Sequence, residues 1–164
     1  MEPTDPAYAG QRHYTPSFLA VYDLLVLGIF ARFVWRCPTH HLVQQYERHV
    51  GRRHLDVGPG TGYLLAHARL PTDTQVLLLD PNPHALAHAS RRLAHLRPTI
   101  LRADVCQPLP IEERFDSVAL NYVLHCLPGP MSRRATTIRQ LAALLEPEGV
   151  LFGATVLGSP SLNT

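Results

Sequence analysis

A glycine-rich loop with an acidic residue in front of it is the first feature of this sequence that could do chemistry. The loop lies in LDVGPGTG, residues 55–62, and its glycines are Gly58, Gly60 and Gly62. Glycine permits a tight turn and a close approach of the backbone to a ligand. Dinucleotide-binding loops have the spacing G-x-G-x-x-G, whereas here the third glycine comes one position early and Tyr63 follows it. Asp56 would repel a pyrophosphate and attract an ammonium group, so the loop favours a cationic ligand.

Three further polar residues stand at the ends of short apolar runs. Asp80 ends the run QVLLLD, Asp104 follows residues 99–103, and Asn121 ends residues 115–121. A carboxylate in the position of Asp80 can accept hydrogen bonds from both hydroxyls of a ribose. It could instead cap the helix expected after it, but its occurrence together with the glycine loop favours a role in binding ribose. Asp104 can accept a hydrogen bond from an exocyclic adenine amine.

The elements that must position these residues alternate along the chain from Pro38 onward. We expect strands at Arg53–Val57, Gln75–Asp80, Thr99–Ala103, Phe115–Asn121 and Gly149–Leu157. We expect helices at Thr39–Val50, Thr61–Leu70, Asn82–Arg97 and Ser132–Leu145. This alternation predicts an α/β fold with a doubly wound, mostly parallel, Rossmann-like sheet. Ligands of such sheets bind outside the carboxyl ends of the strands, where the polar residues above are found.

The N-terminal part of the chain is predicted to cover this core. Residues 1–14 form a polar arm, and an apolar stripe at helical spacing follows over residues 18–35. Asp23 and Arg32 interrupt the stripe and argue against a membrane span. We favour a cap helix on the core, with an interfacial membrane helix as the alternative. The expected division is residues 1–50 as arm and cap helices and residues 51–164 as a cofactor-binding core.

Composition excludes several classes of protein. The chain has 164 residues, a net charge of +2, and 46% hydrophobic residues, which suits one globular domain. Its arginines are scattered and do not form a basic stripe, so nucleic acid is not a favoured partner. Three cysteines without C-x-x-C spacing argue against a disulfide framework or a zinc ribbon. His84, His88 and His95 share helical spacing, but a solvated helix face is favoured over a metal site. The cysteine pattern favours a reducing compartment, so we expect a cytoplasmic location.

Taken together, the motifs resemble those of class I S-adenosylmethionine-dependent methyltransferases. The matching segments are LDVGPGTG, the acid of LLLDPNP, ADVCQPLP, FDSVALNYVLHCL and LLEPEGVLF. They occur in order over residues 55–157. The N-terminal segment over residues 22–35 is faintly similar to ubiquinone/menaquinone-type C-methyltransferases. The resemblance implies S-adenosyl-L-methionine as cofactor, S-adenosyl-L-homocysteine as product, and a small-molecule methyl acceptor.

The resemblance also implies roles for individual residues. Asp56 and the glycine loop would hold the methionine part of the cofactor, and Asn121 would contact the same end. Asp80 would bind the ribose, and Asn82 would line the adenosine pocket. Asp104, with the amide of Val105, would bind the adenine. His125 is the candidate general base, which is needed only if the accepting atom is protonated. Tyr14 and Tyr22 are candidate lid residues on the substrate side.

Two further strands usually follow the fifth strand of this family. Seven residues follow Leu157 here, so we expect a sheet without that pair, and truncation is the favoured explanation. A protein that binds S-adenosylmethionine or a partner without methyl transfer is therefore an alternative. An NAD-dependent oxidoreductase is less favoured, because of the glycine spacing and Asp56. The predicted function is methyl transfer to a small-molecule acceptor.

Overall fold

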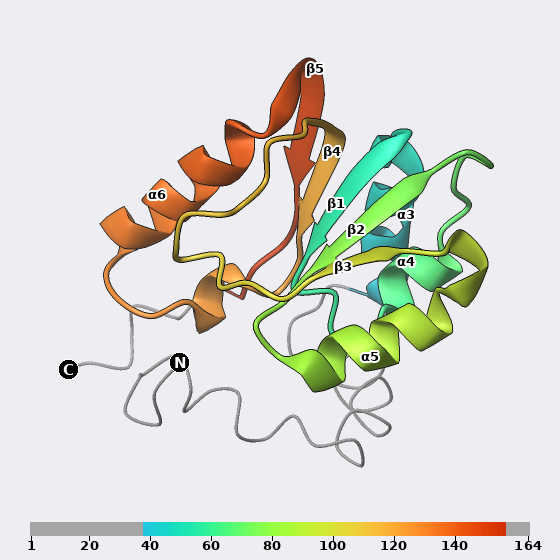
Figure 1. Ribbon diagram of the computed structural model, residues 1–164, viewed down its shortest axis with the longest axis horizontal. Helices are drawn as coiled ribbons and strands as arrows, with labels where there is room; N and C mark the ends of the chain where they lie inside the picture. Colours follow the sequence, from blue (N-terminus) through green and yellow to red (C-terminus); the bar gives the residue numbers. More distant parts are fainter. Residues whose placement is uncertain (1–37, 157–164) are drawn as a thin grey trace.

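A five-stranded parallel sheet with helices on both faces forms the body of the protein, in a computed structural model that describes residues 38–156 (Figure 1). The strands are β1 (Arg53–Val57), β2 (Gln75–Leu79), β3 (Thr99–Leu101), β4 (Phe115–Leu120) and β5 (Leu145–Phe152). The helices are α3 (Thr39–His49), α4 (Tyr63–His67), α5 (Pro83–Arg92) and α6 (Met131–Ala142), with short 3-10 turns η2 (Ala94–Leu96) and η3 (Leu124–Cys126). The predicted α/β class and parallel sheet are confirmed.

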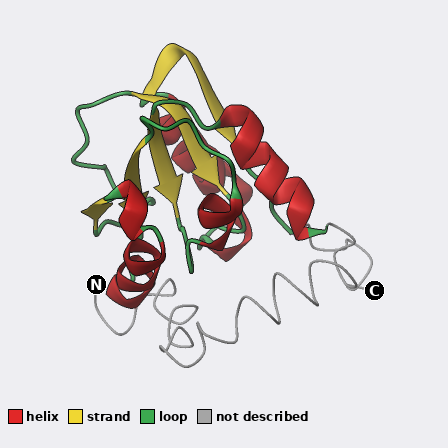
Figure 2. Cartoon of the chain, turned by 90° about the vertical axis from the view of Figure 1, so that its right-hand side faces the viewer, coloured by secondary structure: helices red, strands yellow, loops and turns green. Residues whose placement is uncertain are grey.

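The strand order is β3-β2-β1-β4-β5, which places β1 in the middle of the sheet. Its neighbours β2 and β4 pair with it in parallel, so that Val57 lies beside Leu79 on one side and Leu120 on the other. Parallel strands joined by helices end at the same edge. The chain segments that follow β1, β2 and β4 are therefore brought together at one edge of the sheet. Figure 2 shows the strands and their flanking helices from a second direction.

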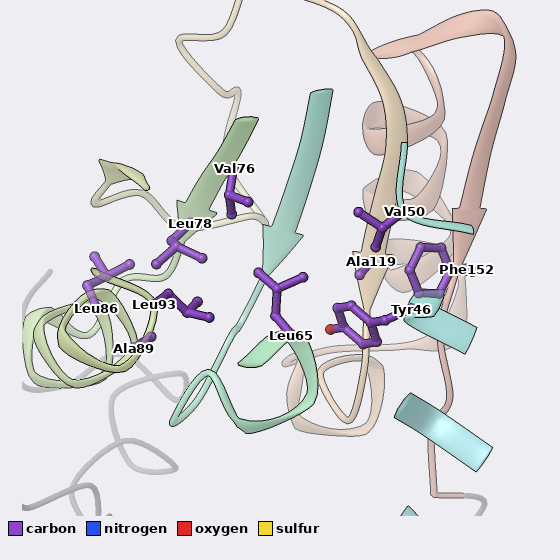
Figure 3. Close-up of a cluster of buried hydrophobic side chains, with 10 residues drawn as sticks. All are labelled: Tyr46, Val50, Leu65, Val76, Leu78, Leu86, Ala89, Leu93, Ala119 and Phe152. Carbon is purple, nitrogen blue, oxygen red and sulfur yellow. The ribbon is translucent and has the colours of Figure 1, made fainter. Parts of the chain in front are cut away.

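Alternation along the buried strands divides the core between the two faces of the sheet. On one face, α3, α4 and α5 pack on β2, β4 and β5 through the cluster drawn in Figure 3. On the other face, Leu55 and Val57 pack with Val118, Leu120 and residues of α6. Successive strand residues point to opposite faces. His54 and Asp56 of β1 consequently face the side that α3 covers.

The junction of α6 and β5 differs from the prediction. The helix was expected to reach Leu145 and the strand to begin at Gly149, whereas α6 ends at Ala142 and β5 begins at Leu145. The Arg114 guanidinium donates to the carbonyls of Ala143 and Leu145, both at 2.9 Å, just beyond the end of the helix. Leu145 then pairs with Phe115, and the register shifts before Val150 pairs with Ser117.

The helix after Asn82 is also shorter than predicted. It ends at Arg92 and tightens into η2, and Arg97 takes a left-handed conformation with φ 50°. Pro98 follows, and the residue before a proline is disfavoured in a helix. The helix predicted over Thr61–Leu70 is likewise limited to α4, a single short segment.

The predicted N-terminal cap helix, Tyr14 and Tyr22 lie outside the described residues. Within residues 38–156, no helix is long and apolar enough to cross a membrane. In the same range, β3 and β5 are the two edge strands of the sheet.

His54 is a fully buried polar group in the centre of the sheet. His54 is 0% exposed, and its ring contacts the rings of Tyr46 and Phe152, with centroid distances of 5.8 and 6.0 Å. Its Nδ1 is 2.9 Å from the Ser117 hydroxyl. Burial lowers the pKa of His54 from 6.5 to about 3, so the imidazole is neutral in the folded protein.

We expect His54 to make the fold acid-sensitive. The unfolded chain binds this proton more readily, so the free energy of unfolding falls as pH drops from 6.5 toward about 3. The slope from one such group is at most about 1.4 kcal/mol per pH unit. His54→Gln should therefore lose less stability than the parent over this window in denaturant titrations. The exposed His95→Gln is the control. Parallel pH profiles for the parent and His54→Gln would contradict the prediction.

Candidate cofactor and active site

A cavity of about 280 Å³ opens where the chain leaves β1, β2 and β4. This volume is close to the lower end of the range for small-molecule sites, about 300 Å³. Seven of the predicted site residues line it: Gly58, Gly60, Asp80, Asn82, Asp104, Val105 and Asn121. The polar groups expected from the sequence thus converge on one space. They come from four separate segments of the chain.

The glycine loop forms one wall of the cavity in a backbone conformation that favours glycine. Gly58 has φ +65°, and a Cβ there would lie 2.4 Å from Cγ2 of Val123. Gly60 has φ +56°, and a Cβ there would have no atom within 4 Å. The Gly58 amide donates to the Leu79 carbonyl at 2.8 Å, which ties the loop to the end of β2. The open space at Gly60 lets a ligand lie directly on the backbone.

Asp80 and Asn82 form a turn between β2 and α5. Asp80 Oδ1 accepts from the Asn82 amide at 2.7 Å, and Asn82 Oδ1 accepts from the His84 amide at 2.8 Å. The side chain that caps α5 is therefore Asn82. Burial raises the pKa of Asp80 to about 6, and the hydrogen bond from Asn82 opposes that rise. Asp80 remains at the cavity wall as an acceptor.

The loop after β3 presents Asp104 and Val105 to the same cavity. Asp104 Oδ1 accepts from the Cys106 amide at 2.9 Å. Gln140 of α6 donates to the carbonyls of Val105 and Gln107, at 3.2 and 3.0 Å. The Gln140 side chain thus links this loop to α6 through two hydrogen bonds. A carboxylate and a backbone amide side by side can recognise an adenine edge.

Asp56 lies behind the cavity wall, in contact with Tyr46. Its side chain is 3% exposed, and its Oδ1 accepts from the Tyr46 hydroxyl at 3.1 Å. Asn121 Nδ2 donates to the same hydroxyl at 3.4 Å, and Asn121 Oδ1 accepts from the Ala154 amide at 2.9 Å. Burial raises the pKa of Asp56 to about 7, and the charge of Asp80 adds to the rise. Burial, and next to it the Asp56 charge, raise the pKa of Tyr46.

Besides Asp56, two predicted residues in the described part of the chain are absent from the cavity lining. Gly62, with φ +72°, is the N-cap of α4, and a Cβ there would come within 3.2 Å of Ala89, so glycine lets α4 and α5 pack closely. His125 is exposed on η3, with Nδ1 3.2 Å from the Thr155 hydroxyl. Burial and the nearby Arg134 lower its pKa. Its neighbour Cys126 does line the cavity.

The cavity lining includes three aromatic residues that were not predicted as site residues: Tyr46, Tyr63 and Tyr122. Tyr46 comes from α3, a helix that was assigned no role in the site, and Tyr122 follows β4. Tyr122 has φ +56°, an uncommon conformation for a bulky residue and one that often occurs at functional sites. The aromatic residue directly after Asn121 was a usable signal for Tyr122. Nothing in the sequence near Tyr46 points to Asp56, which is ten positions away.

Metal chemistry was not predicted for this chain. In the part of the chain that the structure describes, there is no group of three or more His, Cys, Asp or Glu residues that could hold a metal ion.

The comparison with protein families decides what kind of site this is. The model of the methyltransferase domain family matches residues 55–151, more than half of the chain. The chain belongs to the class I S-adenosylmethionine-dependent methyltransferases. The family uses S-adenosylmethionine, so the predicted family and cofactor are confirmed. The residues present fit this cofactor: the backbone at Gly60 is open to a ligand, and the carboxylates of Asp80 and Asp104 at the cavity can accept its hydrogen bonds.

Relatives and solved structures agree with this assignment. Demethylluteothin O-methyltransferase of Streptomyces thioluteus is 45% identical over 92% of this chain and 66% of its own length. A physcion biosynthesis cluster O-methyltransferase of Aspergillus chevalieri is 41% identical over 93% of this chain and 70% of its length. The N-methyltransferase NodS of Bradyrhizobium japonicum, solved with S-adenosyl-L-homocysteine, covers 91% of this chain and 72% of its own at a TM-score of 0.69 and 21% identity. The chain spans about two-thirds of the length of these relatives.

We expect the buried carboxylate of Asp56 to reduce stability at and above neutral pH. Its pKa rises from 3.8 to about 7 on folding, so the folded chain holds the proton more tightly and stability falls as pH rises through this window. Asp56→Asn removes this dependence. Its free energy of unfolding, relative to the parent, should increase by up to about 1.4 kcal/mol per pH unit across the window and then level off. Denaturant titrations at several pH values measure this, and a constant difference between the two proteins would contradict it.

Proposed function

We propose that this domain transfers a methyl group from S-adenosylmethionine to a hydroxyl oxygen of a small-molecule acceptor. The observation that carries the proposal is the convergence of Asp80 and Asp104 with the glycine loop around one cavity. The names of both relatives described above, each an O-methyltransferase, support oxygen as the accepting atom. The NAD-dependent alternative is not supported, since the family match and the glycine spacing both favour S-adenosylmethionine.

Each part of the cofactor has a matching group in this site. Asp80 would accept hydrogen bonds from the ribose hydroxyls, and Asp104 with the Val105 amide would bind the adenine. Asn82, which lines the cavity, would lie on its adenosine side. Asp56, the glycine loop with Gly58, Gly60 and Gly62, and the backbone of Asn121 would hold the methionine end.

The chemistry places modest demands on the chain. When bound, S-adenosylmethionine supplies a methyl group on a positively charged sulfur that is a good leaving group. The residues of the chain need to align the acceptor and exclude water. His125 is the candidate base for the acceptor hydroxyl, because its lowered pKa keeps the imidazole neutral near physiological pH.

The N-terminal part completes the proposal. Residues 1–50 would act as arm and cap over the core of residues 51–164, with Tyr14 and Tyr22 on the acceptor side. A cytoplasmic location suits this arrangement, since the cofactor and the three cysteines belong to a reducing compartment.

Asp80→Ala is expected to weaken binding of S-adenosyl-L-homocysteine at least tenfold, because a hydrogen bond to a charged group contributes about 1.5–3 kcal/mol. Calorimetric titration measures this affinity, with NAD as a ligand expected not to bind. Asp73→Ala removes an exposed carboxylate paired with Arg52 and is the matched control. Unchanged affinity in a folded Asp80→Ala protein would refute the proposed ribose contact.

Methyl transfer itself is expected with small hydroxyl-bearing acceptors. The measurement is release of S-adenosyl-L-homocysteine and the mass of the methylated product, with an amine and a thiol of similar size as competing acceptors. His125→Asn should lower the rate with a hydroxyl acceptor and leave cofactor affinity unchanged, because the base acts only on the acceptor. Tight cofactor binding without transfer to any acceptor would support the non-catalytic alternative.

A further inference from the structure

The Tyr46 hydroxyl occupies a special place between a buried charge and the cofactor cavity. It donates to Asp56 Oδ1 at 3.1 Å and accepts from Asn121 Nδ2 at 3.4 Å. A phenolic oxygen has one proton to donate and two lone pairs. One lone pair thus remains beyond these two contacts, on a residue that lines the cavity.

Asp56 does not reach the cavity by itself. It is 3% exposed and absent from the cavity lining, whereas Tyr46 is part of that lining. A carboxylate attracts a cation through an intervening hydroxyl, because the hydrogen bond polarises the O–H group and makes its oxygen a better acceptor. The contact between the chain and a cation in the cavity on this side is therefore made by the tyrosine.

The groups that surround Asp56 supply no positive charge that would compensate its carboxylate. Tyr46 faces it from α3, Asn121 from the end of β4, and Asp80 acts on it from the end of β2. His54, on the same strand, is neutral when folded. None of these groups is a cation, so a positively charged ligand would meet an uncompensated carboxylate through Tyr46.

We propose that Tyr46 is the positioning residue through which Asp56 binds the amino group of the cofactor's amino-acid end, which makes α3 part of the cofactor site. The proposal rests on the assignment of Asp56 under the proposed function. It extends that assignment to a residue outside the methyltransferase motifs. The tyrosine oxygen accepts from the ammonium group, while Asp56 holds the tyrosine proton on the opposite side.

The test compares two ligands that differ in this end. S-adenosyl-L-homocysteine carries the amino-acid group, and 5′-methylthioadenosine shares the adenosine and sulfur but lacks it. Tyr46→Phe retains the ring that packs edge-on against Phe152 at 5.3 Å. We expect calorimetry to show about tenfold weaker binding of S-adenosyl-L-homocysteine and a change within about twofold for 5′-methylthioadenosine.

A matched control and a double variant complete the experiment. Thr136→Val removes a hydroxyl from an exposed side chain of α6 that does not line the cavity, and it should change neither affinity. In the Asp56→Asn background, Tyr46→Phe should add less than about a twofold further loss, because the two residues act as one unit.

Equal losses for both ligands in Tyr46→Phe would show a purely structural role and overturn the proposal. So would fully additive effects in the double variant, or unchanged binding of both ligands. If Asp56→Asn weakens S-adenosyl-L-homocysteine and Tyr46→Phe does not, only the role of Tyr46 fails. If Asp56→Asn has no effect, the assignment of Asp56 under the proposed function fails first.

Discussion

The hydrogen bond from Tyr46 to Asp56 is the contact on which this site depends. A carboxylate in the interior of a sheet loses its hydration, and it is tolerated only with a partner. Tyr46 provides that partner from α3, and Asn121 joins the hydroxyl from the end of β4. Through one side chain, the helix that precedes the core is connected to the two central strands. The polar group that we propose to contact the cofactor is thereby also a structural link.

Two buried titratable groups on β1 affect stability in opposite ways. His54 is kept neutral and Asp56 has a raised pKa, and both face the side of the sheet that α3 covers. The imidazole favours the folded state as pH rises, whereas the carboxylate disfavours it over an overlapping range. The domain thus tolerates a carboxylate that weakens the fold near neutral pH, as is common where a site requires a buried polar group.

The parallel order of the strands converts separate segments into a site. Asp80, Asp104 and Asn121 are far apart in the chain, but each follows a strand that ends at the same edge. Val123 packs directly against Gly58, so the loop after β4 closes on the loop after β1. Most of the site could be predicted from the sequence for this reason: alternating strands and helices imply a common edge, and the motifs end at that edge.

The α/β class, the bounds of β1 and the seven predicted residues that line the cavity could all be predicted from the sequence, because they depend on local pattern and strand direction. Which side chains of different elements come together beside the cavity depends on tertiary packing. Tyr46 and Asp56 meet because α3 packs across β1. The spacing of residues in the sequence does not predict this contact between a helix and a strand. In the same way, Arg114, the residue before β4, meets the carbonyls of Ala143 and Leu145 where the chain passes from α6 into β5. Periodicity reports what each segment favours, and packing between segments selects the partners.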